Sequence, residues 1–365
     1  MRTAFNHGAV CLNYMPVTAI ERKGGWIQSV TATDKETGEA FRIRTKMVFN
    51  AAGPWVDSIR RLVDPEASTL VRVARGSHIL LDKSFMPGET GMLIPKTRDG
   101  RVLFAIPWHN MLLVGTTDVE QREAEFEPKA TEEEIEFMIE TAQGYLAKPI
   151  TRADVKATFS GLRPLFNPQA TGSAGSTAKV SREHAVIPEY GNMITVTGGK
   201  WTAYRKMAEH AMTEATLRHL VAPRLCVTKT LPILNDETWD PAALEVEAER
   251  SDAADDKVVA YALYCREFEA ARTAEDVLFR RLRLGQMNEA RTNELLPKVR
   301  AAFAGEAEVE KEVAAVVAAT EAAEPVEAKA EAVVEAPETV EAVEKVEAAE
   351  VVEAVEAEKG GKSEK

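Results

Sequence analysis

The sequence predicts an α/β protein, α+β overall, and three observations support this fold class. The apolar run MVFN leads through AAGP into a segment with helical spacing, as a strand, turn and helix do. Short β-like runs, divided by Gly, Pro, Asp and Asn, follow between residues 71 and 119. Residues 240–287 have a mainly helical pattern. The chain is therefore expected to combine sheets with separate helical parts.

Length and composition describe a folded protein that carries an unusual tail. The 365 residues, 45% of them hydrophobic, leave room for two domains with their own cores. The formal net charge is −13, and residues 306–365 hold 18 Glu against 6 Lys, so the rest of the chain is close to neutral. No basic block is interleaved with aromatic residues, so nucleic acid is not expected as a partner.

The cysteines and the N-terminus predict a reduced, cytoplasmic protein without a metal site. Cys11, Cys226 and Cys265 have no metal-ligand spacing and are too scattered for a disulfide framework. The first residues, MRTAFNHGAVCLNYM, lack the unbroken apolar core of a signal peptide, and no run of about 18 apolar residues occurs. We expect neither an export signal nor a membrane-spanning helix.

The first elements are strands followed by a strand-turn-helix unit. The apolar-rich stretch 9–20 precedes the alternating runs 26–32 and 41–43, which are separated by the turn sequence DKETGE. The next segment, MVFNAAGPWVDSIRRLV, predicts a strand, the small-residue turn 51–53 and a helix with Pro54 near its start. Such a turn lets the backbone approach a ligand closely.

The middle of the chain predicts an antiparallel sheet with one helix. GSHILL, GMLIPK, RVLFAIPW and MLLVGTTD are the β-like runs. Thr131 and Glu134 form a capping box that opens a helix reaching about Lys148. VKATFSGLRPLF predicts a further strand, and a loop rich in Gly, Ser and Thr covers residues 171–177.

The segment VTGGKWTAYRKMAEHA raises the question of what approaches its two glycines. An apolar strand ends at Gly198 and Gly199, and a helix follows to roughly Leu220. Free N–H groups and the positive end of a helix favour negative charge, so a flat anionic ligand could lie against this turn. Packing glycines explain most such pairs, and that interpretation stays open.

The C-terminal residues predict a disordered acidic tail from about Gly305. Ala and Glu favour helix, but Glu recurs every three or four residues between 321 and 356, and like charges at that spacing repel. Pro325 and Pro337 interrupt the pattern, and large apolar side chains are absent. We expect disorder with transient helix.

Eight sequence motifs occur in one order along the chain: NAAGPWVD, RGSHILL, FAIPW, VGTTD, SGLRPL, SREH, GGKWTAYRKMAEHA and AEDVLFRRLRLG. With these motifs the chain resembles the FAD-dependent glycerol-3-phosphate dehydrogenases over about residues 4–285. The resemblance implies an incomplete FAD-binding Rossmann-like domain, an antiparallel-sheet substrate domain and a C-terminal helical domain. The expected divisions are 1–68 and 191–222 for the FAD-binding part, 69–190 for the substrate domain, 223–304 for the helical domain and 305–365 for the tail.

The same resemblance implies an activity. Members of this aerobic, quinone-linked family oxidise sn-glycerol 3-phosphate to dihydroxyacetone phosphate by hydride transfer to FAD and pass the electrons to quinone. The implied location is cytoplasmic, peripheral on the inner face of the cytoplasmic membrane. Whether the acceptor is quinone or oxygen stays open, as does the oligomeric state, for which a homodimer is one arrangement.

Site residues are implied at positions that match the family's strings. The FAD contacts would be Ala52, Gly53, Gly198, Gly199 and Thr202. Arg163 and Arg182 would surround the substrate phosphate, because the guanidinium fork binds phosphate oxygens bidentately. Lys200 would lie between phosphate and flavin, and His78 would take the proton of the substrate hydroxyl. Without the resemblance, a surface ion pair and a core histidine are the commoner interpretations of such residues.

One part of the family pattern is absent. The early glycines, Gly8, Gly24, Gly25 and Gly38, do not form the GxGxxG turn that holds the ADP half of FAD. We therefore expect an N-terminally truncated chain that retains FAD poorly when produced alone.

Two alternatives stay open. One is a non-catalytic remnant whose acidic tail serves interaction. The other is a related FAD-dependent amine oxidase, which is disfavoured because a carboxylate substrate does not need both Arg163 and Arg182.

Overall fold

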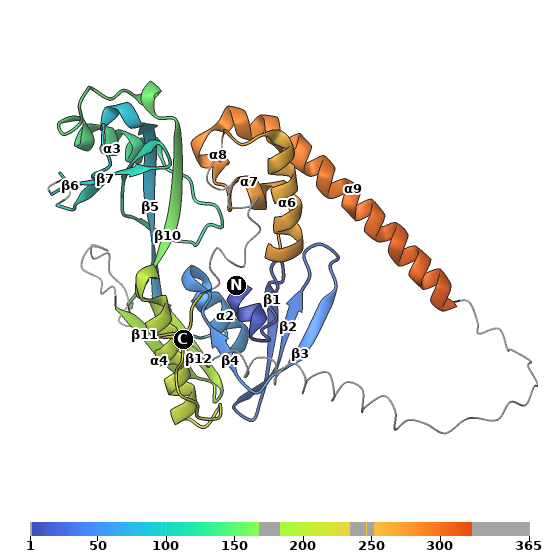
Figure 1. Ribbon diagram of the computed structural model, residues 1–365. Coiled ribbons are helices and arrows are strands. Elements are labelled where there is room, and N and C mark those ends of the chain that lie inside the picture. Colours follow the sequence, from blue (N-terminus) through green and yellow to red (C-terminus); the bar gives the residue numbers. More distant parts are fainter. Residues whose placement is uncertain are drawn as a thin grey trace, which may run out of the picture. The chain divides into compact units, whose positions relative to one another are not determined.

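Three sheets and a helical C-terminal part make up the described chain (Figure 1). The computed structural model describes residues 2–95, 97–98, 100–167, 183–233, 246 and 252–322, with only the backbone of 306–322. Contacts divide the chain into residues 1–308 and 309–365. The predicted α/β class with antiparallel sheets and a helical C-terminal region is confirmed.

The N-terminal sheet is antiparallel, as the alternating runs predict. After α1 (Arg2–Asn6), the strands β1 (Val17–Lys23), β2 (Trp26–Thr33) and β3 (Ala40–Arg44) pair in the order β1-β2-β3. Gly24 and Gly25 form the turn between β1 and β2, both at positive φ, and Gly38 lies in the turn before β3. These glycines serve hairpin turns.

A second sheet joins two distant segments. Its strands β4 (Val48–Asn50), β11 (His184–Glu189) and β12 (Met193–Gly198) have the order β11-β12-β4, with β12 parallel to β4. Each parallel strand leads into a helix: β4 into η1 (Gly53–Trp55) and α2 (Val56–Val63), and β12 into η5 (Trp201–Ala203) and α4 (Tyr204–Leu217). Both predicted strand-turn-helix units are therefore confirmed. Helix α4 ends at Leu217, three residues earlier than expected.

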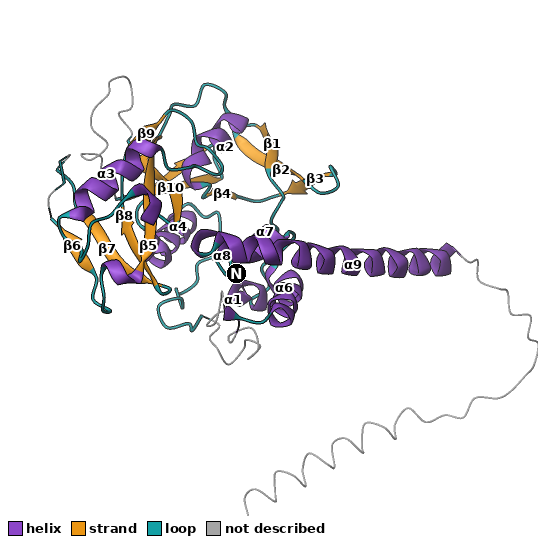
Figure 2. Ribbon diagram, turned by 90° about the horizontal axis from the view of Figure 1, so that it is seen from above, coloured by secondary structure: helices purple, strands orange, loops and turns teal. Residues whose placement is uncertain are grey.

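The third sheet is the predicted β-rich region. Strands β5 (Val71–Asp82), β6 (Met92–Ile94), β7 (Leu103–Trp108), β8 (Met111–Gly115) and β10 (Ala157–Phe166) have the order β10-β5-β8-β7-β6, and β9 (Val119–Gln121) pairs with β5. The short helices η2 (Lys83–Phe85) and η3 (Arg152–Asp154) lie in its connections. Helix α3 (Glu132–Gln143) lies beside this sheet (Figure 2). Its Ile135 and Met138 belong to the same buried cluster as Ile79, Leu81 and Leu112 of the sheet.

The capping box at the start of α3 is confirmed. Thr131 accepts a hydrogen bond from the N–H of Glu134, and the Glu134 carboxylate accepts one from the N–H of Thr131. The helix ends at Gln143 rather than near Lys148. Gly144 follows it as the C-cap, and glycine favours helix termination.

The C-terminal part is helical from residue 252 on, as predicted, and residues 240–245 and 247–251 of the predicted helical stretch lie outside the described residues. It contains α6 (Asp255–Glu269), α7 (Ala274–Leu278), α8 (Leu284–Met287) and α9 (Glu289–Ala322). Val258, Tyr261, Leu278, Leu295 and Val299 belong to one buried cluster. No helix of the described residues is long and apolar enough to cross a membrane.

The expected start of the disordered tail is wrong in one respect. Helix α9 continues through Gly305 to Ala322. Its first turns pack Leu295, Val299 and Phe303 into the helical cluster, which supplies the costly nucleus of the helix, and Ala and Glu then propagate it. The predicted interruptions Pro325 and Pro337 lie outside the described residues.

Truncation after Gly305 should change the free energy of unfolding by less than about 1 kcal/mol, because Leu295, Val299 and Phe303 are retained. Urea unfolding of the two chains checks this. A large loss of unfolding free energy on truncation would show that residues beyond Gly305 contribute to a core. Val299→Ala is the positive control and should cause such a loss, because Val299 lies in the buried helical cluster.

Candidate functional site

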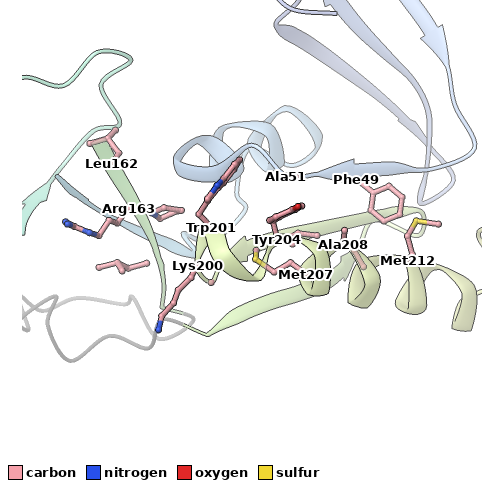
Figure 3. Close-up of a pocket in the computed structure, with 16 residues that line it drawn as sticks. Phe49, Ala51, Leu162, Arg163, Lys200, Trp201, Tyr204, Met207, Ala208 and Met212 are labelled. Atoms are coloured by element: carbon pink, nitrogen blue, oxygen red, sulfur yellow. The ribbon is translucent and has the colours of Figure 1, made fainter. Parts of the chain in front are cut away.

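A cavity of about 880 Å³ lies between α4 and strands β4, β10 and β12 (Figure 3). Its lining is mainly apolar and consists of Phe49, Ala51, Leu162, Arg163, Pro164, Leu165, Val196, Gly198, Gly199, Lys200, Trp201, Tyr204, Met207, Ala208, Ala211 and Met212. Figure 3 shows Arg163 and Lys200 at one end and Phe49 and Met212 at the other. The size and the few polar groups at one end are typical of a ligand pocket.

One face of α4 forms the apolar wall. Tyr204, Met207, Ala208, Ala211 and Met212 recur at the spacing of one helical face, and all of them line the cavity. The ring of Trp201 stacks on that of Tyr204, with centroids 5.8 Å apart, and Trp201 is 86% exposed. A flat aromatic ligand would find stacking partners here.

Close packing within the protein explains why Gly198 and Gly199 carry no side chain. Both have positive φ, +72° at Gly198 and +77° at Gly199. A Cβ on Gly198 would lie 2.5 Å from the carbonyl oxygen of Glu183, and one on Gly199 would lie 2.8 Å from Sδ of Met207. The expectation that these side chains are missing to admit a ligand is therefore incomplete, because Glu183, just before β11, and Met207 of α4 already exclude them. The turn still lines the cavity.

Arg163 is fixed at the polar end of the cavity. It lies on β10, and its Nη1 donates to the carbonyl of Thr117 (3.1 Å) while Nη2 donates to Oγ1 of Thr116 (2.9 Å). Asp118 lies 3.5 Å from Nη1. The guanidinium covers Gly76 of β5 so closely that a Cβ there would be 2.2 Å from Nη2. Only glycine at position 76 permits this placement.

His78 lies beside Arg163 on the same sheet. Its ring stacks on Phe159 with centroids 4.9 Å apart, and a Cβ on Gly115 would lie 2.3 Å from its Cδ2. Its Nδ1 is buried and has no hydrogen-bond partner among the described residues. Burial, and then the positive charge of Arg163, lower the pKa of His78 from 6.5 to about 4. The imidazole is neutral at pH 7 and can accept a proton.

We expect His78 to stay neutral until the pH approaches about 4. The unfolded chain takes up this proton near pH 6.5, so it binds more protons between the two values. The folded state therefore loses stability as the pH falls through this window, by up to about 3 kcal/mol. NMR titration of the ring checks the pKa, with His78→Gln as the reference for assignment. A value near 6.5 would contradict burial beside a cation.

A buried carboxylate network holds this part of the sheet together. Glu134 accepts hydrogen bonds from Oγ of Ser77 (2.9 Å), Oγ1 of Thr117 (2.6 Å) and Nε of Arg75 (3.0 Å). Burial alone would raise the pKa of Glu134, but the hydrogen bonds from Thr117, the Thr131 N–H and Ser77, with the charge of Arg75, lower it. The network connects the residue before His78 to the residues that bind Arg163.

The structure brings some predicted site residues together and leaves others apart. Arg163, Gly198, Gly199 and Lys200 line one cavity, and His78 adjoins Arg163 without lining it. Ala51 lines the cavity, whereas Ala52 and Gly53 do not. Thr202 is exposed in η5 and does not line it either. Arg182 lies outside the described residues.

Several site residues were missed by the sequence analysis. Gly76, Gly115 and Asp118 gain their importance from contacts with Arg163 and His78. These residues occur within the motifs RGSHILL and VGTTD. The motifs identified the segments that form the site, but they did not show which residues contact Arg163 and His78. Trp201 and Met207 lie within the motif GGKWTAYRKMAEHA, but the motif did not identify them as cavity residues.

The chain matches known proteins over most of its length. The family model described as FAD dependent oxidoreductase (DAO) matches residues 1–205. A probable mitochondrial glycerol-3-phosphate dehydrogenase of Dictyostelium discoideum is 32% identical over 346 residues, which cover 81% of this chain and 54% of that protein. The mitochondrial glycerol-3-phosphate dehydrogenase of Arabidopsis thaliana is 36% identical over 252 residues, covering 68% and 39%. The resemblance predicted from the strings is confirmed.

A solved structure is also similar. The glycerol-3-phosphate dehydrogenase of Bacillus halodurans complexed with FAD matches with a TM-score of 0.64 and 25% identity, over 85% of this chain and 71% of that chain. Between about 39 and 54% of the length of the two curated relatives is spanned by the present chain.

Proposed function

Since the chain belongs to the FAD dependent oxidoreductase family, we propose that it carries the substrate end of a flavoenzyme that oxidises glycerol 3-phosphate to dihydroxyacetone phosphate. One observation carries the proposal: a neutral imidazole, His78, lies beside a fixed guanidinium, Arg163, at the polar end of an apolar cavity. A base and a phosphate ligand are what the oxidation of a phosphorylated alcohol needs.

The cavity residues fit the cofactor of the family. The apolar face of α4, the stacked rings of Trp201 and Tyr204, and the turn at Gly198 and Gly199 would hold the isoalloxazine. FAD supplies the acceptor for the hydride when it is bound.

The chain's own residues would bind and deprotonate the substrate. Arg163, assisted by Lys200, would bind the phosphate and so locate the hydroxyl-bearing carbon against the flavin. The neutral ring of His78 would accept the hydroxyl proton as the hydride leaves, and a carbonyl results. The imidazolium would then return its proton to solvent readily, because its pKa is about 4.

Four further parts of the proposal are supported by the family resemblance alone. We propose quinone as the electron acceptor, peripheral association with the inner face of the cytoplasmic membrane, and a homodimer as the assembly. Arg182 is proposed as a second phosphate ligand on the same basis.

Anaerobic spectroscopy tests the function. The purified chain is mixed with FAD, alone and together with the N-terminal part of the Bacillus halodurans enzyme, and the flavin band near about 450 nm is followed. Glycerol 3-phosphate should bleach this band, and an amino acid should not. Failure of both mixtures to bleach would contradict the proposal and favour the non-catalytic remnant. Bleaching by an amino acid alone would favour the amine oxidase.

A further inference from the structure

The residue after the two threonines that bind Arg163 is a buried carboxylate shared between two arginines. The side chain of Asp118 is 4% exposed, its Oδ1 lies 3.5 Å from Nη1 of Arg163, and its Oδ2 lies 3.7 Å from Nη1 of Arg101. Arg101 lies two residues before the start of β7, whereas Arg163 belongs to β10. Asp118 therefore joins cations from two distant segments of the sheet.

Three consecutive residues define one position for the guanidinium of Arg163. Thr116 and Thr117 accept hydrogen bonds from Nη2 and Nη1, and Asp118 adds its charge on the Nη1 side. Gly76 supplies a flat floor beneath the group. A planar fork held on one edge and one face keeps its direction, which matters for bidentate binding of phosphate.

Charge explains why a second arginine takes part. A single buried carboxylate beside Arg163 would cancel much of its attraction for an anion, because charges interact strongly where water is excluded. Arg101 adds a second cation to the same carboxylate, so the three side chains together carry a net charge of +1.

We propose that Asp118 is a positioning residue, which fixes the guanidinium of Arg163 for the substrate phosphate, and that Arg101 keeps the cluster cationic. The inference rests on the proposed function, since phosphate is the expected ligand. It assigns different effects to the two residues: Asp118 fixes the orientation of the Arg163 guanidinium, and Arg101 raises the affinity of the site for the substrate phosphate.

Steady-state kinetics with glycerol 3-phosphate separates the two effects. Asp118→Asn removes the charge at nearly the same shape, and kcat should fall by about tenfold or more while KM changes by less than about threefold. Arg101→Met should raise KM about tenfold and change kcat little. Glu120→Gln is the matched control, because it removes a carboxylate from a more exposed pair with Arg72 and should change neither constant. Equal effects of Asp118→Asn and Glu120→Gln would overturn the proposal.

NMR of the arginine side chains decides the question without turnover. The Nε–H group of Arg163 should be rigid in the wild-type chain and in Glu120→Gln, and mobile in Asp118→Asn, while the overall spectrum stays folded. Unchanged rigidity in Asp118→Asn would overturn the positioning role. If the wild type neither binds nor oxidises glycerol 3-phosphate, the proposed function fails, and this measurement still tests Asp118.

Discussion

Replacement of Arg163 by alanine is expected to lower kcat/KM for glycerol 3-phosphate by about 2–5 kcal/mol of transition-state stabilisation, roughly 30- to 5000-fold. The guanidinium is fixed by Thr116 and Thr117 at the end of the cavity, so a bound phosphate would lose a charge-assisted contact that is already oriented. The measurement is steady-state kinetics of the FAD-loaded enzyme, with the variant and the wild type prepared alike.

Two comparisons decide whether Arg163 acts through the phosphate. Glycerol has no phosphate, so its slow oxidation should change little in Arg163→Ala. Arg72→Ala removes an arginine from the neighbouring strand β5, where it pairs with Glu120, and should affect neither substrate. Equal losses with glycerol and glycerol 3-phosphate would show that Arg163 only supports the sheet.

A second readout follows from the neighbourhood of Arg163. Its charge contributes to the lowered pKa of His78, so Arg163→Ala should raise that pKa toward 6.5. Burial is the larger cause and remains, so the pKa should not reach 6.5. The variant would therefore retain a neutral His78 at pH 7, and lost activity could not be attributed to protonation of the base.

Local signals in the sequence were sufficient for most elements. The strand-turn-helix pattern predicted both β4 with α2 and β12 with α4, and the Thr131 capping box predicted the start of α3. These features depend on neighbours along the chain, and periodicity reports them directly. The parallel pairing of β12 with β4 is different, because it joins residues about 145 positions apart.

Helix ends were predicted less well for a physical reason. Helix α3 ends at Gln143 although apolar residues follow its C-cap Gly144, and α9 passes through Gly305 although glycine disfavours helix. In α9 the packing of Leu295, Val299 and Phe303 outweighs the local propensity. Such packing depends on the cluster formed with α6 and α7, which a window of sequence does not contain.

The site shows the same division. Arg163, His78 and Lys200 could be identified from the sequence, because each lies in a short motif that matches the family. Gly76 could not, because its importance comes from the register of β5 with β10, which places Arg163 opposite Ala74 and its guanidinium over Gly76. Cross-strand contact fixes the side chain here, and sequence spacing does not report it.

The last residue of the motif NAAGPWVD, Asp57, belongs to an ion network that connects α2 with β5 and β11. Arg60 of α2 is 4% exposed and lies between Asp57 and Glu189: Nη1 donates to Asp57 (2.9 Å) and Nη2 to Glu189 (2.7 Å). Burial would lower the pKa of Arg60, but the hydrogen bonds that it donates to Glu189 and Asp57, with the charges of these carboxylates, outweigh burial and raise the pKa. Asp57 also accepts the N–H groups of Leu70 and Val71 at the start of β5.

Replacement of Arg60 by alanine should therefore lower the free energy of unfolding by about 3–5 kcal/mol, because the buried carboxylate of Asp57 and the partly buried one of Glu189 lose their shared cation. Arg61→Ala is the matched control: the adjacent arginine of α2 is exposed, its Nη2 donates to Oγ1 of Thr69, and its loss should cost less than about 0.5 kcal/mol. Urea unfolding at pH 7 gives both values. Similar small losses in the two variants would mean that Asp57 and Glu189 are satisfied without Arg60, and that the link from α2 to β5 and β11 does not depend on charge.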